Sequence, residues 1–528
     1  MSFNLVDEPW VLVQTTEGPD ELSLAQLFAR ADSIRAITGE IPTQGFAILR
    51  VLLAICHDAI GWHTNKAIRS LHDSGIDLDR IQDYLIEHHD VFDLFHPQRP
   101  FMQVAGLRTT KDEHSGLEKL IADVPNGSPF FTTRAGRGLD KISAAEAARW
   151  LVHVQAFDPS GIRSGAVGDI LSKGGRGYPI GPSWAGQIGG IVLHGDNLRE
   201  TLVNNISVTR ESLDDRPVWA LATPHTSERE EESMPAGPVQ TLVWQSRRVR
   251  LVGDREGVRG VVLAQGDKVV PQRMLGIEPM TAWRYSKPQS KSFGRPVYMP
   301  NQHEAGRAMW RGLPALIAAG AEQIDDNGSK FDRFQTPDTV RVADERDATY
   351  VAQAVGIQYG PQKAVIEELI DDRMELPGVL LIDGGTELQV TVTDGVDNAD
   401  TCVRALGQLA ANIARAAGER GDDAGDGARQ RAMAEAWAAL DQPARAWVAS
   451  ISADSDPLEV LRAWQTQVQR IMQDHARILV DRAGPAAIRG RQTNFGYLSA
   501  HKAYSFFLRD LRKELSTIQP TKKETANG

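Results

Sequence analysis

The residues best suited to binding chemistry lie close together in one short stretch, residues 171–186. It holds five glycines and two prolines beside the cations Lys173 and Arg176 and the aromatic residues Tyr178 and Trp184. So many helix and strand breakers predict a loop whose backbone can approach a partner closely. Cations and aromatic rings beside open backbone suit a nucleic-acid surface. The competing interpretation is a surface loop of turn residues with no binding role.

The spacing of these glycines argues against two well-known phosphate-binding loops. Lys173 precedes the glycines, whereas the P-loop pattern GxxxxGK[ST] places the lysine after them. Gly175, Gly177 and Gly181 form GxGxxxG, one residue off the dinucleotide pattern, and no clear strand is predicted before them. Elsewhere the chain has no GxSxG motif, and His303 lacks the second histidine of HExxH.

A second chemistry to compare is the metal-dependent hydrolysis of phosphate esters by His/Asp clusters. The imidazole and carboxylate groups that could hold a divalent metal are those of His57, Asp58, His88, His89 and Asp90. Both groups fall on predicted helix surfaces, where such neighbours are common by chance. We therefore predict no catalytic residue, no metal and no cofactor, and keep an HD-type phosphohydrolase as the alternative function.

Composition limits the class of protein further. The net charge of −11 argues against a free-standing nucleic-acid binder. The charge is uneven, because residues 477–523 hold ten Lys/Arg against three Asp/Glu. The only two cysteines, Cys56 and Cys402, offer neither a disulfide framework nor a metal knuckle, which favours a reducing cytoplasm. Neither a signal peptide nor a membrane span is predicted.

The hydrophobic pattern predicts an α+β protein with two domains. Residues 1–392 read as a large mixed α/β domain, with helices at 44–61, 78–88 and 143–156 and strands at 188–194, 239–252 and 259–271. Residues 340–375 are predicted to be largely helical, and 378–392 to form a hairpin. From about 398 onward four amphipathic helices with short connections predict an antiparallel four-helix bundle over 393–528.

Several phrases, in order along nearly 250 residues, resemble one family, the CasA-type large subunit of the type I-E CRISPR Cascade complex. The resemblance extends over essentially the whole chain. The phrases are Phe3-Asn-Leu-Val-Asp-Glu-Pro-Trp10, Ile41-Pro-Thr with Phe46-Ala-Ile-Leu-Arg-Val-Leu-Leu-Ala54, Arg99-Pro-Phe-Met-Gln103, Gln155-Ala-Phe-Asp-Pro159, Arg216-Pro-Val-Trp219 and Leu242-Val-Trp-Gln-Ser-Arg-Arg-Val-Arg-Leu251.

The resemblance implies a non-catalytic subunit that works with crRNA-containing Cascade subunits. Such proteins recognise the protospacer-adjacent motif in duplex DNA, help to open the duplex, and recruit a separate helicase–nuclease. The protein recognises the adjacent motif, whereas base pairing between the crRNA and one DNA strand recognises the target. Some members carry a cysteine-rich zinc knuckle, but the matching stretch here, about 252–268, has no cysteine and predicts no zinc.

The resemblance also suggests which residues touch DNA. The family's glycine loop, which approaches the minor groove, matches Gly174-Gly175-Arg176-Gly177, between Lys173 and Tyr178. Its wedge hairpin most nearly matches Gly360-Pro361-Gln362-Lys363, with Gln362 as the wedge residue. We predict that these two segments lie close together, although some 185 residues separate them.

Two further elements of the family match less well. Its flexible loop carries a Phe-Val-Asn-type phrase, and the nearest match here is Phe131-Thr132-Thr133, a departure from that pattern. Its motif-contacting lysine would be Lys287 or Lys291. A separate basic group comprises Arg247, Arg248 and Arg250. We expect these side chains either to contact nucleic acid or a neighbouring subunit, or to face solvent.

Overall fold

A computed structural model of the chain divides into two compact units, each described separately below. The first unit comprises Met1–Arg307, Glu322–Asp344 and Tyr350–Arg373, and the second comprises Ala308–Ala321, Glu345–Thr349 and Met374–Gly528. The residues that the structure describes are 2–61, 64–124, 132, 140–208, 214–317, 323–324, 330–341, 348–382, 386–421, 423–493 and 496–518.

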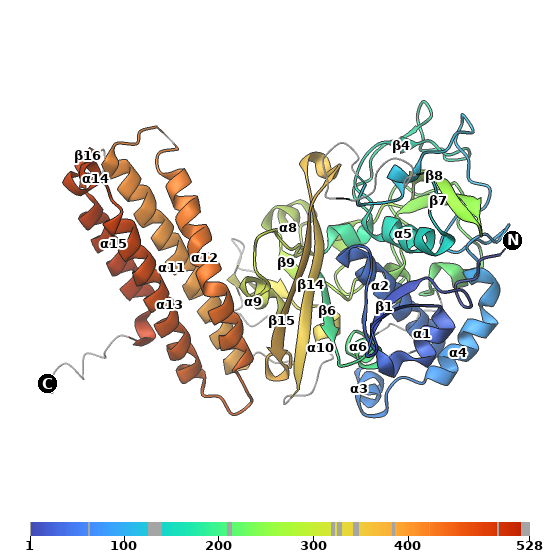
Figure 1. The fold of residues 1–528 in the computed structure, drawn as a ribbon, viewed down its shortest axis with the longest axis horizontal. Helices are drawn as coiled ribbons and strands as arrows, with labels where there is room; N and C mark the ends of the chain where they lie inside the picture. The colour runs from blue at the N-terminus through green and yellow to red at the C-terminus, as the bar shows by residue number, and fades with distance from the viewer. Residues whose placement is uncertain are drawn as a thin grey trace. The chain divides into compact units, whose positions relative to one another are not determined.

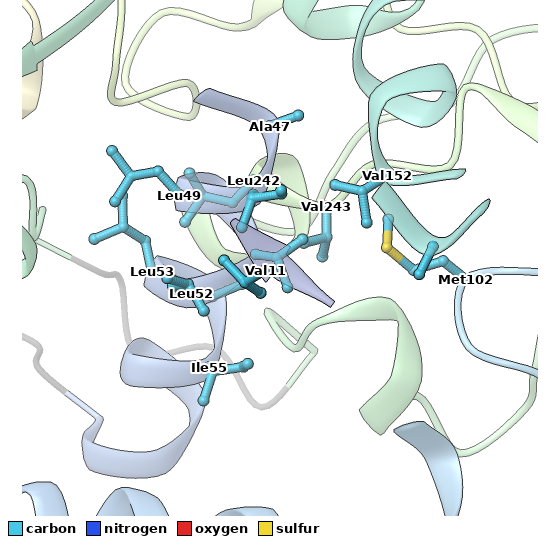
Figure 2. Packing of buried hydrophobic residues seen from close by; sticks show 14 of the residues in the cluster. Val11, Ala47, Leu49, Leu52, Leu53, Ile55, Met102, Val152, Leu242 and Val243 are labelled. Atoms are coloured by element: carbon cyan, nitrogen blue, oxygen red, sulfur yellow. The ribbon is translucent and has the colours of Figure 1, made fainter. Parts of the chain in front are cut away.

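Two helices form the centre of the first unit. Helix α2 (Pro42–Ile60) begins with proline at its first position, where no intrahelical N–H is needed. Helix α5 (Ala144–Phe157) begins at Ser143, whose side chain accepts a hydrogen bond from the N–H of Glu146. Figure 2 shows side chains of α2 packed near the Leu242–Val243 segment. These helices confirm the predictions for 44–61 and 143–156.

Helix α2 is also long and apolar enough to cross a membrane. Its most apolar stretch is 89% buried inside the protein, as expected for the core helix of a folded unit. The first unit also has smaller helices, which are α1 (Leu24–Ala29), α3 (Asn65–Ser74), α4 (Leu78–Glu87), α6 (Leu198–Asn204), α7 (Pro238–Leu242), α8 (Lys287–Phe293) and α10 (Asp338–Arg341). Of these, α4 and α7 pack against α2. The helix at 78–88 was predicted correctly.

The strands of the first unit form several small sheets. One has the order β2 (Pro19–Leu22), β1 (Val11–Thr15), β3 (Ile34–Ile37), and the hairpin β7 (Arg247–Asp254) with β8 (Gly257–Gln265) forms another. A short ribbon pairs β4 (Arg163–Ser164) with β5 (Arg176–Gly177). The remaining short strands are β9 (Trp283–Tyr285), β10 (Tyr298–Pro300), β11 (Gln323–Ile324), β12 (Lys330–Phe331) and β13 (Phe334–Gln335).

A long hairpin replaces the helix predicted for 340–375. Strand β14 (Thr349–Tyr359) lies between β15 (Ile366–Pro377) and β6 (Gly190–His194), in the order β15-β14-β6 (Figure 1). The strand at 188–194 is confirmed, and its antiparallel pairing, Val351 with His194 through Val355 with Gly190, fixes the conformation of β14. The local pattern carried no signal of that distant partner, so the helical prediction was wrong.

The hairpin predicted for 378–392 is also wrong. Strand β15 ends at Pro377, and helix α11 (Glu387–Ala417) begins soon after it. The Thr386 hydroxyl accepts from the N–H of Gln389 while the Gln389 side chain accepts from the N–H of Thr386, a complete capping box. That box starts the helix before the predicted boundary at 393, which therefore falls inside α11.

Four long helices make up most of the second unit. Helix α11 contacts each of the other three, α12 (Asp426–Ala449), α13 (Pro457–Asp481) and α15 (Ala500–Glu514) (Figure 1). Close packing is possible at Gly395, where a Cβ would lie 2.6 Å from Cη2 of Trp447. Smaller elements complete the unit: α9 (Leu313–Ile317), α14 (Pro485–Arg489), β16 (Arg491–Thr493) and β17 (Gly496–Leu498).

Candidate nucleic-acid interface

The glycine-rich stretch forms a tight two-residue turn. Lys173 and Arg176 exchange main-chain hydrogen bonds of 2.9 and 3.1 Å across it. Gly174 and Gly175 at its tip have φ of 58° and 71°, the left-handed pair that a type I′ hairpin turn requires. A side chain at 174 would meet nothing within 4 Å. The tip is therefore bare backbone that a partner can approach.

The ribbon behind this turn has one inward face and one outward face. Arg163 pairs with Gly177 and Ser164 with Arg176. Gly177 is buried, and a Cβ there would lie 3.0 Å from Cγ of Gln265. Arg176 and Tyr178 alternate with it and are exposed. Gly177 thus serves packing, whereas the exposed residues of the turn are free to contact a partner.

A second exposed turn lies at the tip of the β14–β15 hairpin. Gln362 and Lys363 both have positive φ, 57° and 56°, a conformation that costs a residue other than glycine about 1–2 kcal/mol. Both side chains are exposed. The structure therefore holds two consecutive residues in a strained conformation at a protruding tip, as is common at functional turns.

Both turns are tied to the same short segment, residues 157–161. The Ser160 N–H donates to the Lys363 carbonyl at 2.8 Å, and the Tyr359 hydroxyl donates to the Phe157 carbonyl at 2.7 Å. On the other side the Gln265 side chain donates to the Gly161 carbonyl at 2.8 Å and to that of Gly177 at 3.3 Å. The glycine turn and the hairpin tip thus share one support.

A buried charge cluster stabilises that support. Asp158 accepts from Arg247 Nε at 2.5 Å and from Arg163 at 2.7 Å. The Arg247 side chain is fully buried; its Nη1 donates to the Ser246 carbonyl and its Nη2 to the carbonyls of Pro159 and Gly181. Burial raises the pKa of the neighbouring Tyr359 phenol well above its usual value, so its hydroxyl keeps its proton.

The arginines of β7 therefore have a structural role, which the sequence did not reveal. Arg247 and Arg248 are both buried, the latter against Asp267 at 2.8 Å. Arg250 donates to the Leu107 carbonyl at 2.6 Å. Internal partners occupy the buried side chains of Arg247 and Arg248, so for these two a contact with nucleic acid or a neighbouring subunit is not supported. Arg250 is half-buried, and the expectation stays a prediction for it. Asp158 belongs to the segment Gln155–Pro159 that resembles the family, but its pairing with Arg247 depends on the fold.

The other residues suggested for DNA contact belong to two segments, 131–133 and 287–291. Phe131 and Thr133 lie outside the described residues. Thr132 is half-buried, and its hydroxyl lies 3.4 Å from Asp123 Oδ2. Lys287 and Lys291 are exposed on the short helix α8.

The residues of the phosphohydrolase alternative have other partners. Asp58 accepts from the Tyr84 hydroxyl at 2.7 Å and from Arg216 at 2.9 and 3.0 Å. His89 contacts Asp7 at 2.8 Å. Across the described part of the chain, no three His, Cys, Asp or Glu side chains come together in a way that could hold a metal ion. The geometry therefore gives this alternative no support.

Comparisons with known proteins agree with the observed fold. The family model described as CRISPR-associated protein Cse1 matches residues 4–475. A curated relative, CRISPR-associated protein CasA/Cse1 of Thermus thermophilus, is 29% identical over 325 residues. That alignment covers 60% of this chain and 60% of the relative, so it spans less than two thirds of the relative's length.

Solved structures match over nearly the whole chain. Cse1 of Thermobifida fusca is 40% identical with a TM-score of 0.87, covering 98% of this chain and 99% of that one. Cse1 of Acidimicrobium ferrooxidans has the same fold at 24% identity, with a TM-score of 0.79 and 98% and 99% coverage. A chain from a CRISPR RNA-guided surveillance complex matches with a TM-score of 0.66 at 19% identity, covering 90% and 99%. With the family model matching residues 4–475, the chain belongs to the CRISPR-associated Cse1 family, also called CasA.

Proposed function

We propose that this protein is the non-catalytic large subunit of a crRNA-guided Cascade complex, where it recognises the adjacent motif in duplex DNA. The observation that carries the proposal is that two exposed turns, at Gly174 and at Gln362, are anchored to one segment at 157–161. Family membership and the match to a chain of an RNA-guided surveillance complex support it.

The glycine turn is suited to the minor groove for a steric reason. That groove is only about 6 Å wide, which a helix cannot enter but a backbone turn without side chains can. Gly174 and Gly175 offer such a turn, flanked by Lys173 and Arg176. The flanking cations would pair with the phosphates on either side and add affinity that depends on salt but not on sequence.

The hairpin tip is suited to act beside the motif as a wedge. Opening a base step costs a few kcal/mol, so the element that enters must be held rigidly. Two strands of the sheet and the Ser160–Lys363 hydrogen bond hold this tip. Gln362 would then enter between base pairs, and Lys363 would contact the adjacent phosphate.

The remaining parts of the proposal concern partners and domain roles. We assign the adjacent-motif function to the first compact unit, which contains both turns, and we include Phe131, Thr132 and Thr133 as further contacts. The four long helices of the second unit would form an antiparallel bundle that contacts other Cascade subunits. The assembled complex would recruit a helicase–nuclease in trans. The two buried free thiols, Cys56 and Cys402, fit a cytoplasmic location.

The test uses a matched pair of glycine substitutions in the assembled complex. Asparagine tolerates positive φ, so Gly174→Asn should keep the turn and add only a side chain at its tip. We expect motif-dependent binding to duplex DNA to fall about tenfold or more, the effect of losing roughly 1.4 kcal/mol.

Gly306→Asn is the control, because Gly306 also has positive φ (70°) and open space around its Cβ position. It should bind like the unmodified protein. If Gly174→Asn binds duplex DNA as tightly as Gly306→Asn, the glycine turn does not touch the duplex and the site assignment is wrong. Gly177 is unsuitable for this test because a larger residue there would disturb Gln265.

A further inference from the structure

A cavity of about 220 Å³ lies within the first unit. Its lining comes from β3, the first half of α2, β6, α6 and the β14–β15 hairpin. An apolar cavity of about 150 Å³ is large enough to bind benzene, so this space has room for a molecule with one ring. The cavity shares no lining residue with the glycine turn or with the hairpin tip at Gln362.

Part of the lining is apolar and belongs to the core of the unit. Phe46 and Leu49 of α2 line the cavity together with Val192 of β6 and Leu198 of α6, and all four side chains are buried. Such a wall offers dispersion contacts but no hydrogen-bonding group, so burying a polar group against it would cost free energy. The part of an occupant that lies against this wall must therefore be apolar.

Another part of the lining is a connected chain of polar side chains. His194 Nε2 donates to Gln353 Oε1 at 2.7 Å, and Gln353 Nε2 donates to Asp371 Oδ1 at 2.6 Å. Arg373 Nε lies 3.8 Å from the same carboxylate oxygen. Burial lowers the pKa of His194, so its ring is uncharged at neutral pH. These groups satisfy one another and leave no uncompensated charge.

The remaining charged residues of the lining are Glu40 and Arg35. Glu40 is paired with Arg149, whose Nη2 lies 2.8 Å from its Oε1. Arg35 is exposed on β3, and among the described residues no carboxylate lies within ion-pair distance of it. The cavity therefore has one uncompensated positive charge beside an apolar wall. A free guanidinium suits a carboxylate, which it can bind through two parallel hydrogen bonds.

We propose that this cavity binds a small organic monoanion, a carboxylate attached to an apolar ring. The carboxylate would pair with Arg35, and the ring would lie against Phe46, Leu49 and Val192. A nucleotide carries more negative charge together with a polar sugar and base, which the apolar wall does not match. A neutral molecule would leave Arg35 without a partner. The occupant would contact both α2 and the β14–β15 hairpin, so its binding should stabilise the first unit against unfolding.

This inference goes beyond the proposed function. It involves none of the residues that we assign to DNA, and it stands or fails independently of them.

The experiment compares two small probes with the purified 528-residue chain by ¹⁹F NMR. One is 4-fluorobenzoate, and the other is 4-fluorobenzamide, which has the same ring and nearly the same shape but no charge. We expect the benzoate to saturate one site and to bind at least about tenfold more tightly than the amide, as hydrogen bonds to a charged group predict. Arg35→Gln should weaken benzoate binding by about tenfold and change amide binding by less than about twofold.

Arg259→Gln is the matched control. Arg259 is exposed on strand β8, has no carboxylate of the described residues within ion-pair distance, and does not line the cavity. This variant should bind both probes normally. Leu49→Trp, which places an indole in the cavity, should abolish binding of both probes, and its melting temperature shows whether the fold is kept.

Three results would overturn the inference. They are no binding of the benzoate to the unmodified chain, benzoate binding no tighter than that of the amide, and equal benzoate affinity of Arg35→Gln and Arg259→Gln. The last comparison decides even if Leu49→Trp does not fold. Normal benzoate binding by a folded Leu49→Trp chain would show that the benzoate lies outside this cavity, which also contradicts the proposal.

Discussion

The main-chain N–H of Ser160 donates a hydrogen bond of 2.8 Å to the main-chain carbonyl of Lys363. It joins the segment after α5 to the tip of a hairpin some two hundred residues later in the chain. The same segment reaches the glycine ribbon through Gln265, whose side chain bonds Gly161 and Gly177. The two turns that we assign to DNA therefore share a mechanical support, and changes in that support should affect both.

The first prediction concerns the charge cluster at Asp158. Asp158→Asn would leave Arg247, which is fully buried, and Arg163 without a counter-charge. Breaking a buried pair in this way typically costs about 3–5 kcal/mol, so the melting temperature should fall by several degrees or more. Asp20→Asn is the control, because its ion pair with Arg30 is 41% exposed on both sides and such pairs contribute at most about 1 kcal/mol. Equal melting of the two variants would contradict the structural role of Asp158.

The second prediction separates stability from function at the hairpin tip. Gln362→Gly relieves the positive φ of 57° and should raise the free energy of unfolding by about 1 kcal/mol. It also removes the side chain that we place between base pairs. Opening of the duplex, followed with a fluorescent base analogue beside the motif, should therefore fall although the protein is more stable. Gln362→Asn keeps an amide and tolerates the backbone, so it should recover part of the opening. Opening at the normal rate in the glycine variant would rule out the wedge role.

The third prediction concerns the dependence of stability on pH. Burial lowers the pKa of His153 from 6.5 to about 3, because the charged ring would be desolvated. Between these values the unfolded chain binds a proton that the folded chain does not. The contribution of His153 is thus complete above pH 6.5 and is lost as the pH falls toward 3.

Urea titrations of the unmodified protein and of His153→Gln, at pH 7 and pH 5, test this directly. The unmodified protein should lose about 2 kcal/mol more between the two pH values than the variant does. The other titratable groups are the same in both proteins, so the difference isolates His153. A variant with the same pH dependence as the unmodified protein would show that His153 titrates normally in the folded state.

The fourth prediction compares two helical glycines of the second unit. At Gly395 in α11 a Cβ would lie 2.6 Å from Trp447 and 2.9 Å from Trp464, whereas at Gly427 in α12 the nearest atom is 3.6 Å away on the flexible Arg431 side chain. Gly395→Ala should lower the melting temperature of this unit, because overpacking costs about 1–3 kcal/mol. Gly427→Ala should raise it slightly, by up to about 1 kcal/mol of helix propensity. Stabilisation by both substitutions would mean that the tryptophans move aside.

The sequence by itself determined the elements whose signals are local. Helices α2, α4 and α5 follow from their apolar spacing, and Ser143 caps α5 as its position before the helix predicts. The four long helices of the second unit also follow from periodicity. The glycine-rich stretch was predicted to be a loop, because so many glycines and prolines break helices and strands.

Only the tertiary structure decided which of these residues are buried and which are exposed. The strand β14 depends on pairing with β6, which no local pattern encodes. The burial of Arg247 and Gly177 and the exposure of Tyr178 depend on the register of a short ribbon and on Asp158. Contacts between residues far apart in the chain, such as Ser160 with Lys363, form only when the whole unit folds. They bring the glycine turn and the hairpin tip onto one support, and a linear pattern of residue types cannot specify that geometry.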